Sequence, residues 1–160
     1  MPSQILKVVM DFIAGALAVV IFHQGAYVLL KQVGLPLQGA AWNMAPAANA
    51  YGMPSLFNLM FWGGLWGILY ALIADYLPGP SVLKGLVFGM IFPMLLGSWL
   101  IVALLKGQPI LSGVLIDGNL MRLRTGFLLN GAAFGIGLGL LYALLTTVTG
   151  IGARAGADAR

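Results

Sequence analysis

Four apolar runs, each about as long as a bilayer is thick, constrain this chain more than any other feature. A membrane-spanning helix needs about 20 mostly apolar residues. The runs that meet this requirement cover residues 12–30, 55–77, 81–105 and 125–148. Together they take up most of the 160 residues and leave no room for a soluble domain. The sequence predicts an all-α membrane protein with four transmembrane helices, in a single integral membrane domain over residues 1–160.

Charged residues are too few to cover a soluble domain. Asp, Glu, Lys and Arg make up 8% of the chain, against about 25% in soluble globular domains. This composition excludes a soluble enzyme, a nucleic-acid-binding domain and a disordered chain. The net charge of +4 comes from scattered cations, a pattern typical of contact with anionic lipid headgroups. The partner it predicts is the lipid bilayer and not nucleic acid.

The side chains that covalent and metal chemistry require are scarce. The chain has no cysteine and one histidine, which excludes thiolate nucleophiles, iron–sulfur clusters and a bis-histidine haem. Its eight methionines are spread over spans and loops without metal-binding spacing. We expect no enzymatic activity, no metal site and no cofactor.

Part of the second span recurs in the fourth. Eight residues of the second span are repeated 72 positions later, and the same offset places Gly25 on Gly97. These identities predict two tandem helical hairpins, about residues 12–80 and 84–150, followed by a polar tail at 151–160. Since each repeat has two spans, both insert in the same orientation and form parallel repeats. Duplication that serves only to build a compact bundle is an equally open explanation.

Glycines at four-residue spacing mark one face of the second span and one face of the fourth. They are Gly63 and Gly67 in the second span, and Gly131, Gly135 and Gly139 in the fourth. Small residues let helix backbones approach closely, which favours packing in lipid. We therefore expect the second and fourth spans to touch through these glycines across the pseudo-twofold axis, with the first and third spans outside.

Polar side chains inside the apolar runs gather in one half of the bilayer. This half faces loop 1, between the first two spans, and loop 3, between the last two. The residues are His23, Gln24, Tyr27, Asn58, Ser98 and Asn130. Asn58 and Asn130 are related by the repeat, so we expect both to be architectural, with amides that bond between helices or to loop carbonyls.

His23 and Gln24 break the repeat, because Leu95 and Leu96 stand at the matching positions. A buried ionisable group is costly in a membrane, so such a group is a functional candidate by default. We take His23 and Gln24 as the candidate intramembrane polar site. The alternative is a neutral histidine that ties helices together by bonding to one of the neighbouring polar side chains, namely Tyr27, Asn58 or Ser98.

Three segments carry a resemblance to a known group of proteins: FHQ at 22–24, WNMAP at 42–46 and FWGGLWG at 61–67. With them, the chain resembles a group of small uncharacterised bacterial inner-membrane proteins with four helices. The resemblance implies a multi-pass inner-membrane protein from a bacterium. It implies no activity, and no functional residue can be carried over from it.

Lysine and arginine do not decide the orientation of the chain in the membrane. Four lie on the side of the termini and four on the side of loops 1 and 3, so the positive-inside rule gives a tie. We expect the termini in the cytoplasm, because the first helix often dominates. Asp11 and Asp75 fall at span ends on the terminal side, where we expect water or headgroups to reach them.

Two functions remain open from the sequence. The first is an accessory, assembly or self-associating subunit that uses its glycine-lined helix faces, with a second copy or another membrane subunit as partner. The second is a carrier or channel for a small solute or proton, with its site at His23 and Gln24.

Overall fold

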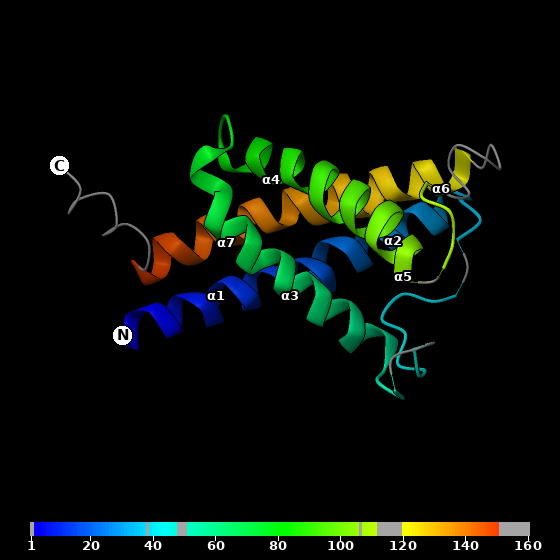
Figure 1. The fold of residues 1–160 in the computed structure, drawn as a ribbon, viewed down its shortest axis with the longest axis horizontal. Helices are drawn as coiled ribbons and strands as arrows, with labels where there is room; N and C mark the ends of the chain where they lie inside the picture. The colour runs from blue at the N-terminus through cyan, green and yellow to red at the C-terminus, as the bar shows by residue number, and fades with distance from the viewer. Residues whose placement is uncertain (1, 38, 48–50, 106, 112–119, 151–160) are drawn as a thin grey trace.

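The computed structural model describes residues 2–37, 39–47, 51–105, 107–111 and 120–150. Within these residues, four helices are long and apolar enough to cross a membrane: Gln4–Gln32, Ser55–Tyr76, Ser81–Leu105 and Leu123–Thr149. We refer to them as spans 1 to 4 (Figure 1). They confirm the predicted all-α class with four helices of membrane-spanning length and composition. Most of loop 3 and the predicted polar tail at 151–160 lie outside the described residues.

The spans are not uniform α-helices. Span 1 consists of α1 (Pro2–Ala18), η1 (Val19–His23) and α2 (Gln24–Gln32), and span 2 of α3 (Ser55–Ile73) and η2 (Ala74–Tyr76). Span 3 consists of α4 (Ser81–Gly89), η3 (Met90–Ile101) and α5 (Val102–Leu105), and span 4 of α6 (Leu120–Thr125), η4 (Gly126–Phe134) and α7 (Gly135–Thr149). The segments η1, η3 and η4 are π-helical, and η2 is a 3₁₀ turn.

Pro93 accounts for one of the π-helical segments. Proline has no backbone N–H and cannot make the regular hydrogen bond of a helix interior. Span 3 accommodates it within η3, where Pro93 is buried. The sequence predicts a kink at this proline, and the local structure found there is a wider helical turn.

Span 1 packs against span 2 through a contact between glycine backbones. Gly15 of α1 lies against Gly63 and Gly67 of α3, and a methyl group on Gly15 would overlap the carbonyl oxygen of Gly63. Gly67 also lies beside Asp11, and Gly63 beside Val19, so the two helices run antiparallel. We call this the first glycine contact. Only glycine allows backbones to approach this closely.

Span 4 packs against span 3 in a similar way. Gly85 of α4 lies against Gly135 and Gly139 of α7, and a methyl group on Gly85 would overlap the carbonyl oxygen of Gly135. We call this the second glycine contact. Within η4, Gly131 lies against Gly89 and the side chain of Met90.

The prediction that these glycines join spans 2 and 4 is wrong. Gly63 and Gly67 face span 1, whereas Gly131, Gly135 and Gly139 face span 3. The physical reason is that spans 1 and 3 carry glycines of their own. Gly15 and Gly85 give each of these glycine faces a close-packing partner in the span that precedes it along the chain, so neither face is left for a contact between spans 2 and 4.

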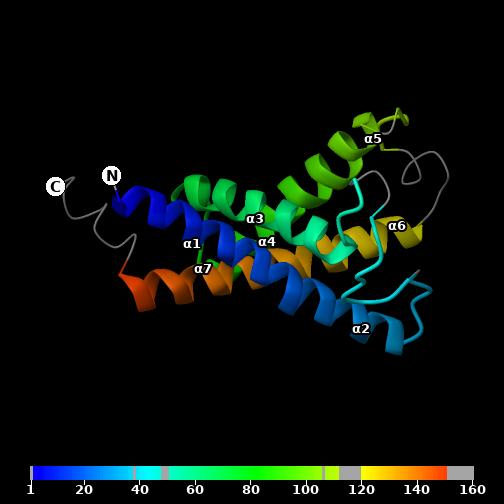
Figure 2. The same ribbon diagram turned by 90° about the horizontal axis from the view of Figure 1, so that it is seen from below.

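The pair formed by spans 1 and 2 meets the pair formed by spans 3 and 4 through spans 1 and 4 and through a group of aromatic rings. Phe22 of span 1 lies on Gly137 of span 4, and α1 and α7 lie side by side (Figure 2). Between spans 2, 3 and 4, the ring of Tyr70 packs edge-on against Phe88 and Tyr142, with centroid distances of 5.2 and 5.3 Å. Tyr70 and Phe88 are fully buried, and these rings form the centre of the core.

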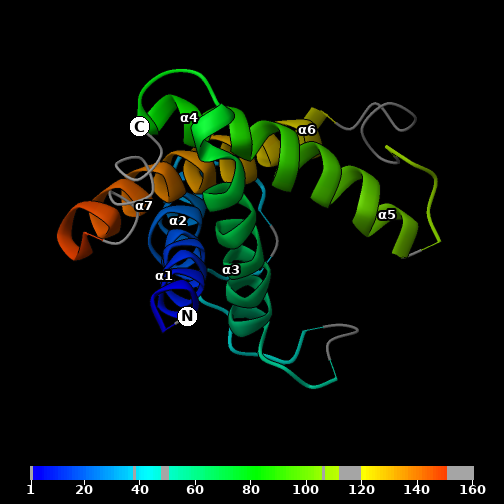
Figure 3. The same ribbon diagram turned by 60° about the vertical axis from the view of Figure 1, so that its left-hand side comes forward.

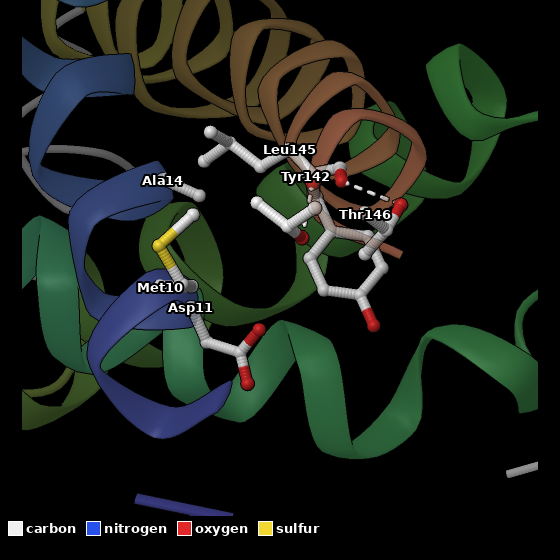
Figure 4. Close-up of a pocket in the computed structure, with 7 residues that line it drawn as sticks. Met10, Asp11, Ala14, Tyr142, Leu145 and Thr146 are labelled. Carbon is white, nitrogen blue, oxygen red and sulfur yellow. Dashed lines mark hydrogen bonds between the residues drawn. The ribbon is translucent and has the colours of Figure 1, made fainter. Parts of the chain in front are cut away.

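Near the terminal end of the bundle, α1 and α7 enclose a cavity of only about 10 Å³ (Figure 4). This volume is at the lower limit for a single water molecule. Asp11 lines the cavity, is 5% exposed and accepts a hydrogen bond from Lys7 Nζ at 3.0 Å. The expectation that water or headgroups reach Asp11 is wrong, because span 1 begins at Gln4 and extends well past this residue. Asp75 is exposed, as expected.

The glycine contacts predict a selective response to a single methyl group. Gly15→Ala and Gly85→Ala should each lower the free energy of unfolding by about 1–3 kcal/mol, because the new methyl group overlaps backbone atoms that cannot move aside cheaply. Gly25→Ala in α2 of the same span is the matched control, since no atom outside its own helix turn lies within 4 Å of the new group. Unfolding in mixed micelles with increasing SDS, followed by circular dichroism, measures the difference. Equal stability of Gly15→Ala and Gly25→Ala would contradict the packing.

Candidate functional site

A cavity of about 450 Å³ lies among the four spans, in the half of the bundle that carries loops 1 and 3. Small-molecule pockets typically measure about 300–1,000 Å³. Its polar lining groups come from all four spans and are His23, Asn58, Ser98 and Asn130. The other lining residues are apolar or aromatic, and among the described residues no charged side chain lines it. Four of the six polar residues singled out from the sequence thus share one cavity.

Three of these polar residues belong to the π-helical segments. His23 ends η1, Ser98 lies in η3 and Asn130 lies in η4. A π-helical turn contains more residues than an α-helical turn, so it changes the direction in which the following side chains point. π-helical turns are rare in proteins, and those that occur are often located at functional sites. Asn58, by contrast, lies in the regular helix α3.

A hydrogen bond from loop 1 fixes the arrangement on one side of His23. The backbone N–H of Trp42 donates to Gln24 Oε1 at 2.9 Å. The other end of the same amide, Gln24 Nε2, therefore faces His23 Nδ1, at 3.2 Å. An amide nitrogen can only donate. His23 Nδ1 is consequently an acceptor, and the ring proton of the neutral imidazole is on Nε2.

A backbone carbonyl fixes the arrangement on the other side of His23. Ser98 Oγ donates to the carbonyl oxygen of Pro93 at 2.9 Å, so its oxygen is left to accept from Asn130 Nδ2 at 2.8 Å. The amide of Asn130 is thereby oriented with Oδ1 toward His23 Nε2, at 3.2 Å. This oxygen can only accept, so His23 Nε2 carries the proton. The hydrogen bonds on both sides of His23 therefore require the same tautomer, with the proton on Nε2.

The result is a directional chain of hydrogen bonds, which we call the His23 chain. It runs from Trp42 through Gln24, His23, Asn130 and Ser98 and ends at the Pro93 carbonyl. A second ring proton on His23 would face the amide protons of Gln24. The chain therefore holds the imidazole in its neutral form and connects loop 1 with spans 1, 3 and 4.

Loop 1 folds back against span 1 at Trp42. The indole Nε1 donates to the carbonyl oxygen of Val20 at 3.0 Å, in addition to the backbone bond with Gln24. Trp42 has a φ of 49°, a left-handed conformation that is rare outside glycine. Irregular backbone is tolerated at membrane depth only where protein groups satisfy it. Beyond Trp42, loop carbonyls accept from the first N–H groups of α3.

The sequence does not predict this role of Trp42. Its contact comes from irregular backbone, and hydrophobic periodicity carries no information about such segments. The π-helical segments are also missed, apart from the disturbance expected at Pro93. A polar residue next to a glycine, such as Ser98 after Gly97 or Asn130 before Gly131, is at most a weak sign of them.

The remaining predicted site residues have different surroundings. Gln24 is 4% exposed and donates to His23 Nδ1, and it does not line the cavity. Tyr27 lies outside the lining. Asn130 makes the interhelical bonds expected of it. The side chain of Asn58 lies on the cavity wall, and none of its polar atoms bonds to the protein as far as the structure describes it.

No protein-family model matches this chain, and neither a curated protein nor a solved structure is significantly similar to it. The geometry of the cavity therefore has to carry the functional argument. Among the described residues, no group of three or more His, Cys, Asp or Glu side chains is placed to hold a metal ion.

The two asparagines give a matched test of the His23 chain. Asn130→Leu should lower the free energy of unfolding by about 1–3 kcal/mol, because it leaves His23 Nε2–H without an acceptor and Ser98 without its donor. Asn58→Leu should leave stability unchanged or raise it slightly, since the amide it removes has no partner in the part of the chain that the structure describes. Thermal unfolding of both variants in the same detergent provides the measurement. A larger loss for Asn58→Leu than for Asn130→Leu would overturn the assignment of their roles.

Proposed function

We propose that the protein is a small membrane carrier that binds a solute in the cavity beside His23. The observation that carries this proposal is the cavity of about 450 Å³ with neutral polar groups from all four spans on its wall. Burial of polar groups at membrane depth is costly. A protein that only needed to pack its helices would have no use for a cavity at the level where those groups gather.

The accessory-subunit hypothesis receives less support from the packing. Its glycine-lined faces would have to be available to a partner, yet Gly63, Gly67, Gly131, Gly135 and Gly139 are buried against spans of the same chain. A partner or a second copy could dock only on the outer faces of the spans. Those faces carry large apolar side chains, as any lipid-facing surface does.

The predicted duplication is part of this proposal, since a carrier built from parallel repeats has its site between them. In both glycine contacts, one glycine of the leading span lies between two glycines of the following span. The following-span glycines are 72 positions apart, as in the sequence repeat, whereas the leading ones, Gly15 and Gly85, are 70 positions apart. Gly25 and Gly97 do not make equivalent contacts, because Gly97 lies against Trp66 and Gly25 has no neighbour within 4 Å.

The location that fits the proposal is the bacterial inner membrane, as the resemblance of the three sequence segments implies, with the termini in the cytoplasm. Loop 1 and the cavity are then near the periplasmic surface. Alkaline phosphatase is active only outside the cytoplasm, so a fusion to the C-terminus measures the orientation. An inactive fusion supports termini in the cytoplasm. An active fusion would place the C-terminus in the periplasm and contradict the proposed orientation.

Filling the cavity tests the carrier proposal. Val102→Trp places a large ring in the cavity, whereas Leu104→Trp adds the same ring to the same short helix at a position outside the lining and 58% exposed. After gentle extraction, native mass spectrometry should find a small molecule bound to the wild-type protein and to Leu104→Trp. Val102→Trp should retain at least about tenfold less of it, equivalent to ~1.4 kcal/mol of lost binding.

A bound second polypeptide without any small molecule would overturn the carrier proposal in favour of an accessory subunit. Equal retention of the small molecule by Val102→Trp and Leu104→Trp would also overturn the carrier proposal, since the molecule would then lie outside the cavity.

A further inference from the structure

We infer that the ligand of the cavity is a neutral amphiphile dissolved in the bilayer, which enters between spans 2 and 3 and hydrogen-bonds through its polar head to Asn58. The inference rests on the carrier proposal and names the class of ligand. Three independent features of the cavity lead to it: the absence of charge on its described lining, the free amide of Asn58 and the position of its opening.

The lining favours an uncharged head. Among the described residues that line the cavity, none carries a formal charge, and the His23 chain holds the one ionisable group, His23, in its neutral form. A carboxylate, phosphate or ammonium head would find no opposite charge there and would lose its hydration. The cost of burying such a group without a partner is several times that of burying a hydroxyl or carbonyl.

Of the four residues His23, Asn58, Ser98 and Asn130, it is Asn58 whose side chain has hydrogen-bonding capacity to spare among the described residues. Both ring nitrogens of His23 are occupied, by Gln24 and by Asn130, and the amide of Asn130 is occupied at both ends. The amide of Asn58 offers two donor protons and an acceptor oxygen. A hydroxyl, ester or amide head complements it, and the repeat-related Asn130 cannot take this part because His23 and Ser98 already use it.

The opening of the cavity faces the bilayer sideways. Leu59 and Trp62 of span 2 and Ile101 of span 3 line the cavity and yet are 39%, 45% and 40% exposed. These side chains are therefore shared between the cavity and the outer surface of the bundle. Figure 3 shows α3 and α5 diverging from each other toward this end of the bundle. An apolar chain can pass between them without leaving the hydrocarbon region.

The aromatic part of the cavity wall suits an apolar tail. Trp66 and Phe134 line the cavity together with the rim residues, and Trp66 packs against Phe88 of the buried aromatic group. These rings are held in place from behind and present flat apolar surfaces. A tail of several methylene groups gains contact there, while its head reaches Asn58.

The test uses three photoreactive probes with the same ten-carbon chain and different heads: an alcohol, a carboxylate and an ammonium. Each is incorporated in phosphatidylcholine nanodiscs that hold the wild-type protein, and the crosslinked residues are identified by mass spectrometry. The alcohol should label the rim of spans 2 and 3 saturably, with unlabelled decanol as competitor. Labelling by the two charged probes should be at least about fivefold lower, the equivalent of one hydrogen bond or more.

Two variants of Asn58 connect the selectivity to this residue. Asn58→Leu should reduce saturable labelling by the alcohol about fivefold, and Asn58→Gln, which keeps an amide, should recover part of it. Labelling at Leu144, a lipid-facing residue of span 4 that is 57% exposed, reports non-specific contact and should be the same in all three proteins.

Equal labelling of the rim by the three probes, or labelling by the alcohol that Asn58→Leu does not change, would overturn the inference. The carrier proposal would survive either result if native mass spectrometry still finds a small molecule that Val102→Trp displaces. Preferential labelling by the carboxylate would also overturn the inference and would assign an anionic ligand to the cavity.

Discussion

The chain of hydrogen bonds through His23 is the interaction on which the polar half of the bundle depends. Its two ends are backbone groups, the Trp42 N–H and the Pro93 carbonyl, so its direction is not adjustable by rotation of a side chain. Because every internal member both donates and accepts, the chain satisfies its polar groups without using a charge. It also holds loop 1 against span 1 and joins spans 1, 3 and 4, which provides the cavity with a fixed wall.

The glycine contacts explain why a cavity can exist beside that wall. Gly15 and Gly85 let span 1 pack tightly on span 2, and span 3 on span 4, through backbone contact within each pair. The two pairs of spans then need to meet along only part of their length, at spans 1 and 4 and at the Tyr70 rings. Toward loops 1 and 3, spans 2 and 3 are free to diverge, and the π-helical segments bring polar side chains to the space that results.

Much of the fold follows from the sequence because it depends on composition along the chain. Length and hydropathy predict the four spans, and the absence of charge makes His23 and the neighbouring amides stand out. The partner of each glycine face does not follow, since spacing within one helix contains no information about which helix it meets. Asn58 and Asn130 show a second limit: they are related by the repeat, but only Asn130 lies in a π-helical segment opposite His23.

The most direct test of this account is the ¹⁵N NMR spectrum of the imidazole at neutral pH in a lipid bilayer. The chain has a single histidine, so its signals need no assignment. The account predicts a neutral ring with Nε2 protonated and Nδ1 bare, as the bonds to Asn130 and Gln24 require. A proton on Nδ1, or an imidazolium with both nitrogens protonated, would contradict the directional chain and the cavity wall built on it.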